Sequence, residues 1–361
     1  MSSRADSPGA PELPTSAYDY DLPPGRIAAH PAGERDASRL LVVRRDRDTF
    51  EHRAFRDIVE YFEPGDVLVL NETRVIPARL LGTRERGGTA EIVLLHPLHE
   101  GAAGAEWPTE WTALVRPGSK LRDGRRITVS GELAVEIVQV LPDGTRHVRL
   151  HTPLPVRDAV QMYGRMPLPP YIERDVEPAD AERYQTVYAR AEGSVAAPTA
   201  GLHFTPALIE ALEAKGVYVV RVVLHVGVGT FRPVEVEDPA AHEMHAEWYE
   251  VTPAAAAAID AARAAGGRVW AVGTTVARTL ETVVGEDGCI AAGSGWTRLF
   301  IRPGYEFRAV DALITNFHLP RSTLLMLVSA FAGHDRTMAA YRTAVAEDYR
   351  FYSYGDAMVI P

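Results

Sequence analysis

The segment TPALIEALEAKGVYVVRVVL at residues 205–224 decides the fold class, because a helix pattern runs directly into a strand pattern. Thr205 is a typical N-cap, Pro206 is a typical first helical residue, and Gly216 ends the helical period. The run at 217–224 is apolar and β-branched without polar alternation, which is typical of a strand covered on both faces. A helix that leads into a buried strand indicates an α/β protein.

The same order occurs twice more along the chain. Thr252 and Pro253 begin a second helix, which leads into the strand pattern RVWAV at residues 268–272. The third strand pattern, AVDALIT at residues 309–315, is followed by a helix with Ser322 as its N-cap. Helices that alternate with apolar strands predict a three-layer α/β body with a mostly parallel sheet.

A binding edge follows from this topology. Ligands of open α/β sheets bind beyond the carboxyl ends of the parallel strands. The polar residues that directly follow the three strand patterns are His225, Gly273–Thr275 and Asn316–His318. If the three strands share one sheet, we expect these residues to meet at the same edge, between the apolar segments that hold them in place.

The stretch from residue 66 to residue 155 has a different pattern. Short strand-like runs are separated by turn signals such as PDGT at 142–145, and no helical period of useful length appears. This pattern predicts a small β-barrel domain at 66–155, inserted into an α/β body formed by 18–65 and 156–361. The polar, proline-rich residues 1–17 are expected to form a disordered tail.

Composition excludes several classes of protein. The chain has 361 residues, 46% of them hydrophobic, and its longest apolar runs fall short of the roughly 20 residues that span a bilayer. Cys289 is the only cysteine, which excludes internal disulfides and Cys-based metal clusters and fits a reducing compartment. The N-terminus lacks the basic and apolar stretches of a secretion signal. We therefore expect a cytoplasmic globular protein without membrane contact.

The net charge of −10 argues against a protein that is coated by nucleic acid, but it allows a local basic contact. Almost all basic residues are arginines, which reflects either a GC-rich genome or the recognition of phosphates by guanidinium groups. The loop RPGSKLRDGRR at 116–126 gathers five basic residues with Asp123 as the only acid. It is interpreted either as a nucleic-acid contact or as a solvated turn.

Two further motifs are candidates for chemistry. In HEMHAEWYE (242–250), His242 and His245 have a spacing that suits one face of a helix, but zinc-protease motifs use a wider spacing. A metal site, an exposed turn and an acid/base or substrate contact remain as alternatives. In GSVAAPTAGLHFT (193–205), small residues lead to His203 at a helix start, which suits either a ligand or tight packing.

Long collinear motifs carry a resemblance to one family. The sequence resembles the S-adenosylmethionine:tRNA ribosyltransferase-isomerases of queuosine biosynthesis over nearly its whole length, apart from a short N-terminal stretch. The motifs include PGDVLVLNETRVIPARL (64–80), VAAPTAGLHFT (195–205), HEMHAEWY (242–249), DALITNFHLPRSTLLMLVSAFAG (311–333) and YRFYSYGDAM (349–358). Two positions depart from the family pattern. Val276-Ala277 replaces Ser-Val, and Arg321 stands where the family has an acidic residue or lysine.

The resemblance implies an α/β body with an inserted β-barrel and a transferase that uses S-adenosylmethionine. Such an enzyme transfers and isomerises the ribosyl moiety of S-adenosylmethionine onto 7-aminomethyl-7-deazaguanine at the wobble position of tRNA. Epoxyqueuosine-tRNA is formed, and adenine and methionine leave. S-adenosylmethionine is then a consumed cosubstrate, no further cofactor or metal is implied, and a monomer is expected.

The resemblance also suggests roles for residues in the matching motifs. The reaction needs a general base and a proton donor that work near neutral pH. The acid/base candidates are His203, His225, His245 and His318. The residues expected to bind S-adenosylmethionine are Thr274, Thr275, Asn316, His242 and Glu247. The residues expected to contact tRNA phosphates are Arg74, Arg79, Arg116, Lys120, Arg122 and Arg126. We expect no essential role for Arg321.

Three rival functions remain at this point. A tRNA methyltransferase would use the same cosubstrate but leave S-adenosylhomocysteine. A non-catalytic RNA-binding module built on the β-domain would bind tRNA without consuming S-adenosylmethionine. A metal-dependent hydrolase that uses His242 and His245 would lose activity to a chelator.

Overall fold

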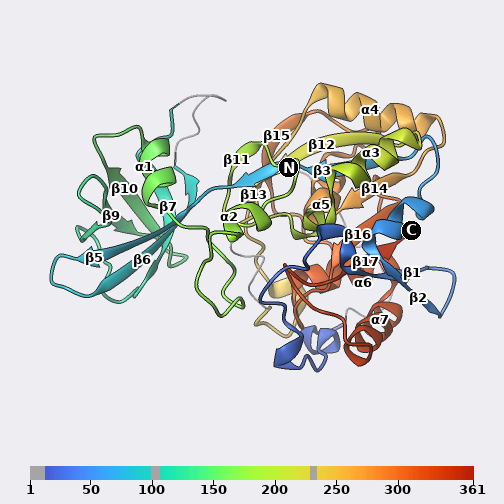
Figure 1. Ribbon diagram of the computed structural model, residues 1–361, viewed down its shortest axis with the longest axis horizontal. Coiled ribbons are helices and arrows are strands. Elements are labelled where there is room, and N and C mark those ends of the chain that lie inside the picture. The colour runs from blue at the N-terminus through green and yellow to red at the C-terminus, as the bar shows by residue number, and fades with distance from the viewer. Residues whose placement is uncertain (1–12, 99–105, 228–233) are drawn as a thin grey trace.

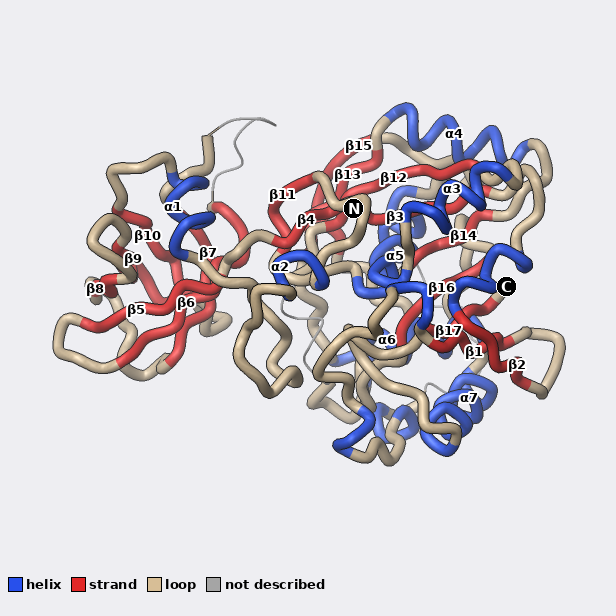
Figure 2. The backbone as a smooth tube through the Cα atoms, in the orientation of Figure 1, coloured by secondary structure: helices blue, strands red, loops and turns tan. Residues whose placement is uncertain are grey.

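The structure is a computed structural model that describes residues 13–98, 106–227 and 234–361. Figure 1 shows two parts, an α/β body and a smaller β-barrel that stands apart from it on the left of the view. Figure 2 shows the same separation, with the helices gathered mainly around the strands of the body. The predicted α/β fold with a small barrel is therefore confirmed.

A nine-stranded sheet forms the centre of the body, in the order β15-β13-β12-β3-β14-β16-β17-β1-β2. The four neighbours β12, β3, β14 and β16 are parallel, as predicted, whereas antiparallel strands extend the sheet on both sides. The sheet as a whole is mixed. Its strands are β1 (Arg39–Val43), β2 (Phe50–Ala54), β3 (Val67–Asn71), β12 (Tyr218–Leu224), β13 (Glu247–Val251), β14 (Val269–Val272), β15 (Gly293–Thr297), β16 (Ala312–Asn316) and β17 (Ala357–Ile360).

Helices cover both faces of this sheet. The longer ones are α3 (Pro206–Ala214), α4 (Pro253–Ala264), α5 (Thr274–Val283), α6 (Thr323–Ala332) and α7 (His334–Ala346). Val67 and Val69 of β3 share a core with α4 to α7, whereas Leu68 and Leu70 pack with α3 and the short helix η4 (Phe55–Tyr61) on the other side. Because alternate residues of a strand point to opposite faces, the body has three layers. Within the described residues, no helix is long and apolar enough to cross a membrane.

The predicted helix starts are correct. The side chains of Thr205, Thr252 and Ser322 each accept a hydrogen bond from a backbone N–H in the first turn, at 3.1, 3.2 and 3.2 Å. Such caps satisfy donors that the helix itself leaves unpaired. The strand β12 departs from the prediction of full coverage, because Tyr218 is 58% exposed and burial is continuous only from Val222 onward.

A closed six-stranded barrel forms the smaller part, in the order β10-β7-β6-β5-β8-β9. Its interior is an apolar core of its own, which includes Leu80, Ile92 and Ile137. The barrel strands are β5 (Arg79–Arg84), β6 (Thr89–Pro97), β7 (Glu110–Arg116), β8 (Arg126–Thr128), β9 (Ala134–Val140) and β10 (Arg146–His151). The helix α1 (Val156–Tyr163) packs against this core through Val156 and Val160.

The predicted domain boundaries, 66–155 for the barrel and 18–65 with 156–361 for the body, need correction at both ends. The strand β3 belongs to the large sheet because its fully buried residues pair with β12 and β14. The helix α1 belongs to the barrel because its apolar face is buried there. Between the two parts, β4 (Thr73–Val75) pairs in parallel with β11 (Ala191–Ser194).

The remaining short helices lie mainly in connections and near the N-terminus. They are η1 (Thr15–Tyr18), η2 (Pro24–Arg26), η3 (Arg35–Ala37), α2 (Asp180–Arg183), η5 (Thr199–His203) and η7 (Pro239–Ala241). The prediction of a disordered tail over 1–17 is wrong for residues 13–17. Thr15 is buried and its hydroxyl donates to the carbonyl oxygen of Val236 at 2.7 Å, which anchors this segment. Residues 1–12 lie outside the described part of the chain.

A buried carboxylate joins the amino ends of the central strands. Asp66, which is 2% exposed, accepts hydrogen bonds from the backbone N–H groups of Glu63 and Arg268, the guanidinium of Arg268 and the indole of Trp270, at 2.9–3.0 Å. Its backbone carbonyl accepts from Tyr218 N at 2.8 Å. Burial alone would raise the pKa of Asp66, but these hydrogen bonds hold it below its ordinary value. Asp66 thereby fixes β3 against both β12 and β14.

Replacing Asp66 with alanine is expected to lower the free energy of unfolding by about 3 kcal/mol, because it leaves the Arg268 and Trp270 donors without their acceptor. Urea unfolding at pH 7 measures this loss, and Asp46→Ala in the exposed β1–β2 turn serves as the control. The folded-state pKa of Asp66 lies below its unfolded value of about 3.9, so its contribution is present above that pH and is lost as the pH falls through the folded pKa. If Asp66→Ala lowered the free energy of unfolding by as much in acid as at pH 7, this account would be contradicted.

Candidate active site

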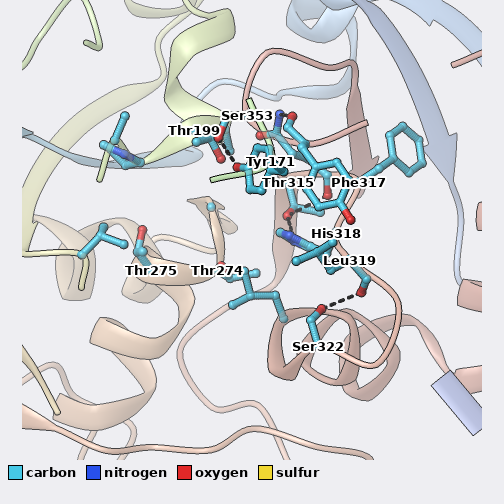
Figure 3. Close-up of a pocket in the computed structure, with 18 residues that line it drawn as sticks. Tyr171, Thr199, Thr274, Thr275, Thr315, Phe317, His318, Leu319, Ser322 and Ser353 are labelled. Carbon is cyan, nitrogen blue, oxygen red and sulfur yellow. Dashed lines mark hydrogen bonds between the residues drawn. The ribbon is translucent and has the colours of Figure 1, made fainter. Parts of the chain in front are cut away.

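A pocket lies at the carboxyl edge of the parallel strands. It is formed by the residues that follow β14 and β16, by the start of α5, and by the segments 197–200 and 352–353. Figure 3 shows these side chains converging from separate elements. Gly273–Thr275 and Asn316–His318 both line it, which confirms that these two predicted segments meet at one edge.

Asn316 lines this pocket and carries a buried amide oxygen. Its side chain is 2% exposed, and its Nδ2 donates to the carbonyl oxygen of Tyr352 at 3.0 Å. Because a carbonyl only accepts hydrogen bonds, this contact identifies the nitrogen of the Asn316 amide. Within the described residues Oδ1 has no hydrogen-bond partner. A buried carbonyl in this state lowers its free energy by accepting a donor from a bound molecule.

His203 lies behind the pocket and holds the Asn316 amide. Its Nδ1 is 2.7 Å from Ser38 Oγ, its Nε2 is 3.2 Å from Asn316 Nδ2, and its ring stacks on Phe55. Burial lowers the pKa of His203 to about 4, so the ring is neutral at pH 7. Because both ring nitrogens are engaged, the geometry favours a positioning role over the acid/base role that the sequence suggested.

The start of α5 supplies donors on another side of the pocket. Thr274 and Thr275 are buried in the first turn, where backbone N–H groups lack partners inside the helix. Thr275 is 9% exposed, and in the described part of the chain its hydroxyl oxygen has no partner. Gly273 precedes them with φ of 89°, a conformation that favours glycine. A helix start with such a hydroxyl suits a carboxylate or a ribose hydroxyl.

His318 lines the pocket with its ring fixed by a neighbour. Its Nε2 is 2.8 Å from the hydroxyl oxygen of Thr315, and that hydroxyl donates to the carbonyl oxygen of Asn316 at 3.4 Å. In the tautomer that donates from Nε2 to Thr315, Nδ1 is the acceptor of the ring. Burial lowers the pKa of His318 to about 3, so the ring is neutral at pH 7.

Two tyrosine rings that were not predicted form an aromatic part of the pocket wall. The ring centroids of Tyr171 and Tyr352 are 4.5 Å apart, and both residues line the pocket. Tyr352 has φ of 70°, which is uncommon for a bulky residue and indicates a constrained position. Aromatic faces attract cations such as a sulfonium. Nothing in the periodicity of the sequence marks these tyrosines, although Tyr352 lies in the motif YRFYSYGDAM.

His225 also lies outside the pocket lining. His225 directly follows β12, but its ring stacks on Trp248 with centroids 5.1 Å apart, and its neighbour Val226 lines the pocket instead. Thr73 Oγ1 is 2.7 Å from its Nδ1. Burial lowers the pKa of His225 to about 4. Its predicted position at the carboxyl edge is therefore correct, but its side chain does not line the pocket.

His242 and His245 do not form the predicted helical pair. The chain runs from the short helix η7 into the strand β13, so the helix periodicity on which that pairing depended is missing. The ring of His242 packs against Phe300, and burial followed by the charge of His245 lowers the pKa of His242. Within the described residues, no group of three or more His, Cys, Asp or Glu side chains is arranged to hold a metal ion. The structure gives no support to a metal site at this motif.

Glu247 is buried in an ion pair and does not line the pocket. Its Oε2 pairs with Nη1 of Arg278, and its Oε1 accepts from Gly227 N at 2.9 Å. Arg278 also donates to the carbonyl oxygen of Leu299 at 3.0 Å. A buried carboxylate needs such partners, so Glu247 ties β13 to α5. Arg278 was not predicted, because an arginine in a helix usually faces solvent.

The basic residues predicted to contact tRNA differ in availability. The exposed ones are Arg74, Arg116, Lys120, Arg122 and Arg126. Arg79 instead forms hydrogen bonds of 3.1 and 3.2 Å to Glu91, which neutralises its charge. Arg146, which was not predicted, donates to the carbonyl oxygens of Leu121 and Gly118 at 2.9 and 3.0 Å. This buried guanidinium holds the basic loop 116–126 in shape.

Comparisons with known proteins agree with this architecture. A family model described as queuosine biosynthesis protein matches residues 15–360. The S-adenosylmethionine:tRNA ribosyltransferase-isomerase of Symbiobacterium thermophilum is 57% identical over 347 residues, which is 96% of this chain and 99% of that protein. The protein of the same name from Moorella thermoacetica is 57% identical over 345 residues, covering 95% of this chain and 98% of that protein.

A solved structure shows the same relationship. The crystal structure of S-adenosylmethionine tRNA ribosyltransferase from Thermotoga maritima is 40% identical, covers 96% of this chain and 100% of its own, and superposes with a TM-score of 0.54. Since the family model spans nearly the whole chain and the relatives share more than half of its residues, the chain belongs to the queuosine biosynthesis protein family.

Proposed function

We propose that this protein transfers and isomerises the ribosyl moiety of S-adenosylmethionine onto 7-aminomethyl-7-deazaguanine at the wobble position of tRNA. Epoxyqueuosine-tRNA is the product, and adenine and methionine leave. S-adenosylmethionine is consumed as a cosubstrate. The observation that carries the proposal is the pocket, which is lined by Asn316, Thr275 and two tyrosines and in which Asn316 Oδ1 and Thr275 Oγ1 have no partner among the described residues. The names of the relatives support S-adenosylmethionine and tRNA as the reactants.

The pocket offers a complementary group for each part of S-adenosylmethionine. The first turn of α5, with Thr274 and Thr275, suits the methionine carboxylate or the ribose hydroxyls, which are hydrogen-bond acceptors or donors. The faces of Tyr171 and Tyr352 suit the sulfonium and the flat adenine ring. Asn316 Oδ1 suits a donor such as an amino group.

His318 is the proposed general base. The sulfonium acidifies the ribose 5′-carbon, and the reaction begins when a base removes a proton from that carbon. The neutral His318 ring lines the pocket, and in the proposed tautomer Nε2 donates to Thr315 while Nδ1 accepts the proton. The aminomethyl nitrogen of the tRNA base, in its uncharged form, then attacks the activated ribosyl group. His225 and His245 are not assigned to the chemistry, since neither lines the pocket.

The barrel is the proposed contact for the tRNA backbone. Arg116, Lys120, Arg122 and Arg126 are exposed on the barrel, and Arg74 is exposed on β4 between the two parts. Such cations attract phosphates without reading sequence. The wobble base must leave the anticodon stack to enter the pocket, so backbone contacts at a distance from the pocket are needed to hold the loop.

Incubation with S-adenosylmethionine and tRNA that carries the aminomethyl base is expected to release free adenine and to add a ribosyl-sized mass to the tRNA. Mass spectrometry of both products measures this, and tRNA without the aminomethyl group is the control. Formation of S-adenosylhomocysteine with a methyl-sized gain would make the protein a methyltransferase. Binding of tRNA without consumption of S-adenosylmethionine would make it a non-catalytic module.

His203→Ala is expected to lower turnover about tenfold, because Asn316 loses the partner that orients its amide. If His203 acts only through Asn316, the double variant with Asn316→Ala will be no slower than Asn316→Ala alone. Steady-state adenine release gives all three rates, with the exposed His30→Ala as the histidine control and thermal unfolding as a check on folding. If the double variant is slower than Asn316→Ala by the same factor that separates His203→Ala from the wild type, His203 acts independently of Asn316.

The affinity for S-adenosylmethionine is expected to stay constant between about pH 5 and pH 7. Burial places the pKa of His318 at about 3, so this ring gains a proton, and then repels the sulfonium, only as the pH falls below that range. Calorimetric titration without tRNA, which avoids turnover, measures the dissociation constant at each pH. A loss of affinity centred near pH 6 that disappears in His318→Asn would contradict the low pKa.

A further inference from the structure

A row of aromatic side chains crosses one end of the large sheet and is not used by the pocket. His225 N donates to the carbonyl oxygen of Trp248 at 2.9 Å, and Trp248 pairs directly with Trp296 across β13 and β15. Residues directly opposite each other in neighbouring strands project their side chains to the same face. His225, Trp248 and Trp296 therefore lie side by side on one face, and we call them the aromatic row.

The aromatic row connects the pocket with the barrel. At one end, the rings of His225 and Trp248 stack with centroids 5.1 Å apart and planes 18° apart, and the next residue, Val226, lines the pocket. At the other end, Trp296 meets the ring of His96 on the barrel strand β6, with centroids 5.4 Å apart. Figure 1 shows β13 and β15 on the side of the body nearest the barrel.

The exposure of Trp296 is unusual for a residue that only stabilises the fold. Its side chain is 46% exposed although tryptophan is among the most apolar residues. Large exposed apolar side chains often mark binding sites, and tryptophan is enriched where one face must meet a partner. At the inner end, Thr73 fixes Nδ1 of His225, and a side chain at Gly193 would collide with the His225 ring at 2.7 Å. The inner end of the row is therefore rigid.

We propose that the aromatic row is a stacking platform for unpaired bases of the tRNA anticodon loop, next to the base that enters the pocket. This inference rests on the proposed function. When the wobble base leaves the stack, its neighbours lose a stacking partner, and aromatic side chains are the usual replacement in proteins that bind single-stranded RNA. The row has the position for this role, because it begins beside the pocket and ends at the barrel with its exposed cations.

The platform and the basic residues of the barrel then contribute to tRNA binding in different ways. Cations on the barrel bind phosphates, and their contribution weakens as salt rises because counterions are released on binding. Stacking on Trp296 involves no counterion, so its contribution is nearly independent of salt. This difference separates the two contacts experimentally, since removal of the indole lowers affinity without changing the salt slope.

The test uses an anticodon stem–loop with 2-aminopurine next to the wobble position, because the fluorescence of this base is quenched when it stacks. Trp296→Leu keeps an apolar side chain but removes the aromatic face, and Trp296→Phe retains a smaller one. We expect Trp296→Leu to bind about tenfold more weakly and to lose most of the quenching. Trp296→Phe should stay within about threefold of the wild type. Tyr218→Ala, at the far end of β12 and also exposed, is the matched control and should bind as the wild type does.

Two further measurements keep the platform separate from the proposed reaction. The affinity of Trp296→Leu for S-adenosylmethionine should be unchanged, and its salt slope for the stem–loop should equal that of the wild type. Unchanged stem–loop affinity and quenching in Trp296→Leu overturn the platform while leaving the reaction intact, whereas absence of adenine release by the wild type overturns the reaction alone. If Trp296→Leu alters only the oligomeric state in sedimentation, the row is a contact between copies of this chain, and the platform is overturned.

Discussion

The carboxylate of Asp66 is the constraint on which the position of the site depends. It accepts four hydrogen bonds at the amino ends of the central strands and thereby fixes β3 relative to β14, while its backbone carbonyl fixes β12. Because parallel strands rise by similar amounts per residue, a fixed register at one end determines the register at the other. Since β16 pairs in parallel with β14, the loops after these two strands meet at one edge of the sheet, and the pocket is formed there.

Hydrogen bonds to neighbouring residues hold the polar side chains of the pocket in position and thereby determine its chemistry. The chain of contacts from Ser38 through His203 holds the amide of Asn316, which lines the cavity and whose Oδ1 has no partner among the described residues. In the same way, the hydroxyl of Thr315 holds Nε2 of His318, which also lines the cavity. In both cases a neutral group is held in one orientation by a hydrogen bond on its far side, which lowers the cost of binding a polar ligand. A ligand in the proposed site would therefore meet oriented dipoles and no charged side chain of the pocket lining.

The parts of the structure that were predictable from the sequence depend on local signals. Local sequence signals encode the helix caps at Thr205, Thr252 and Ser322 and the apolar strands next to these helices. These signals correctly predict the edge of the sheet at which the pocket lies. The direction of a side chain beyond a strand end is set by contacts with distant residues, so His225 and His318 looked equivalent in the sequence. Asp66 and Arg278 carry no local signal, because their burial depends on strands and helices far away in the chain. For the same reason, the boundary of the barrel was misplaced at β3.

The insertion of the barrel after β3 has a consequence for the order in which the chain acquires its structure. Val67 pairs with Tyr218 and Val269, which are synthesised much later, so the central strand of the sheet must wait for its partners. The barrel strands follow one another closely between Arg79 and His151, and contacts between nearby segments form faster than distant ones. We expect the barrel to close while the apolar strand β3 is still exposed on the ribosome, which makes β3 the segment most in need of protection from aggregation during synthesis.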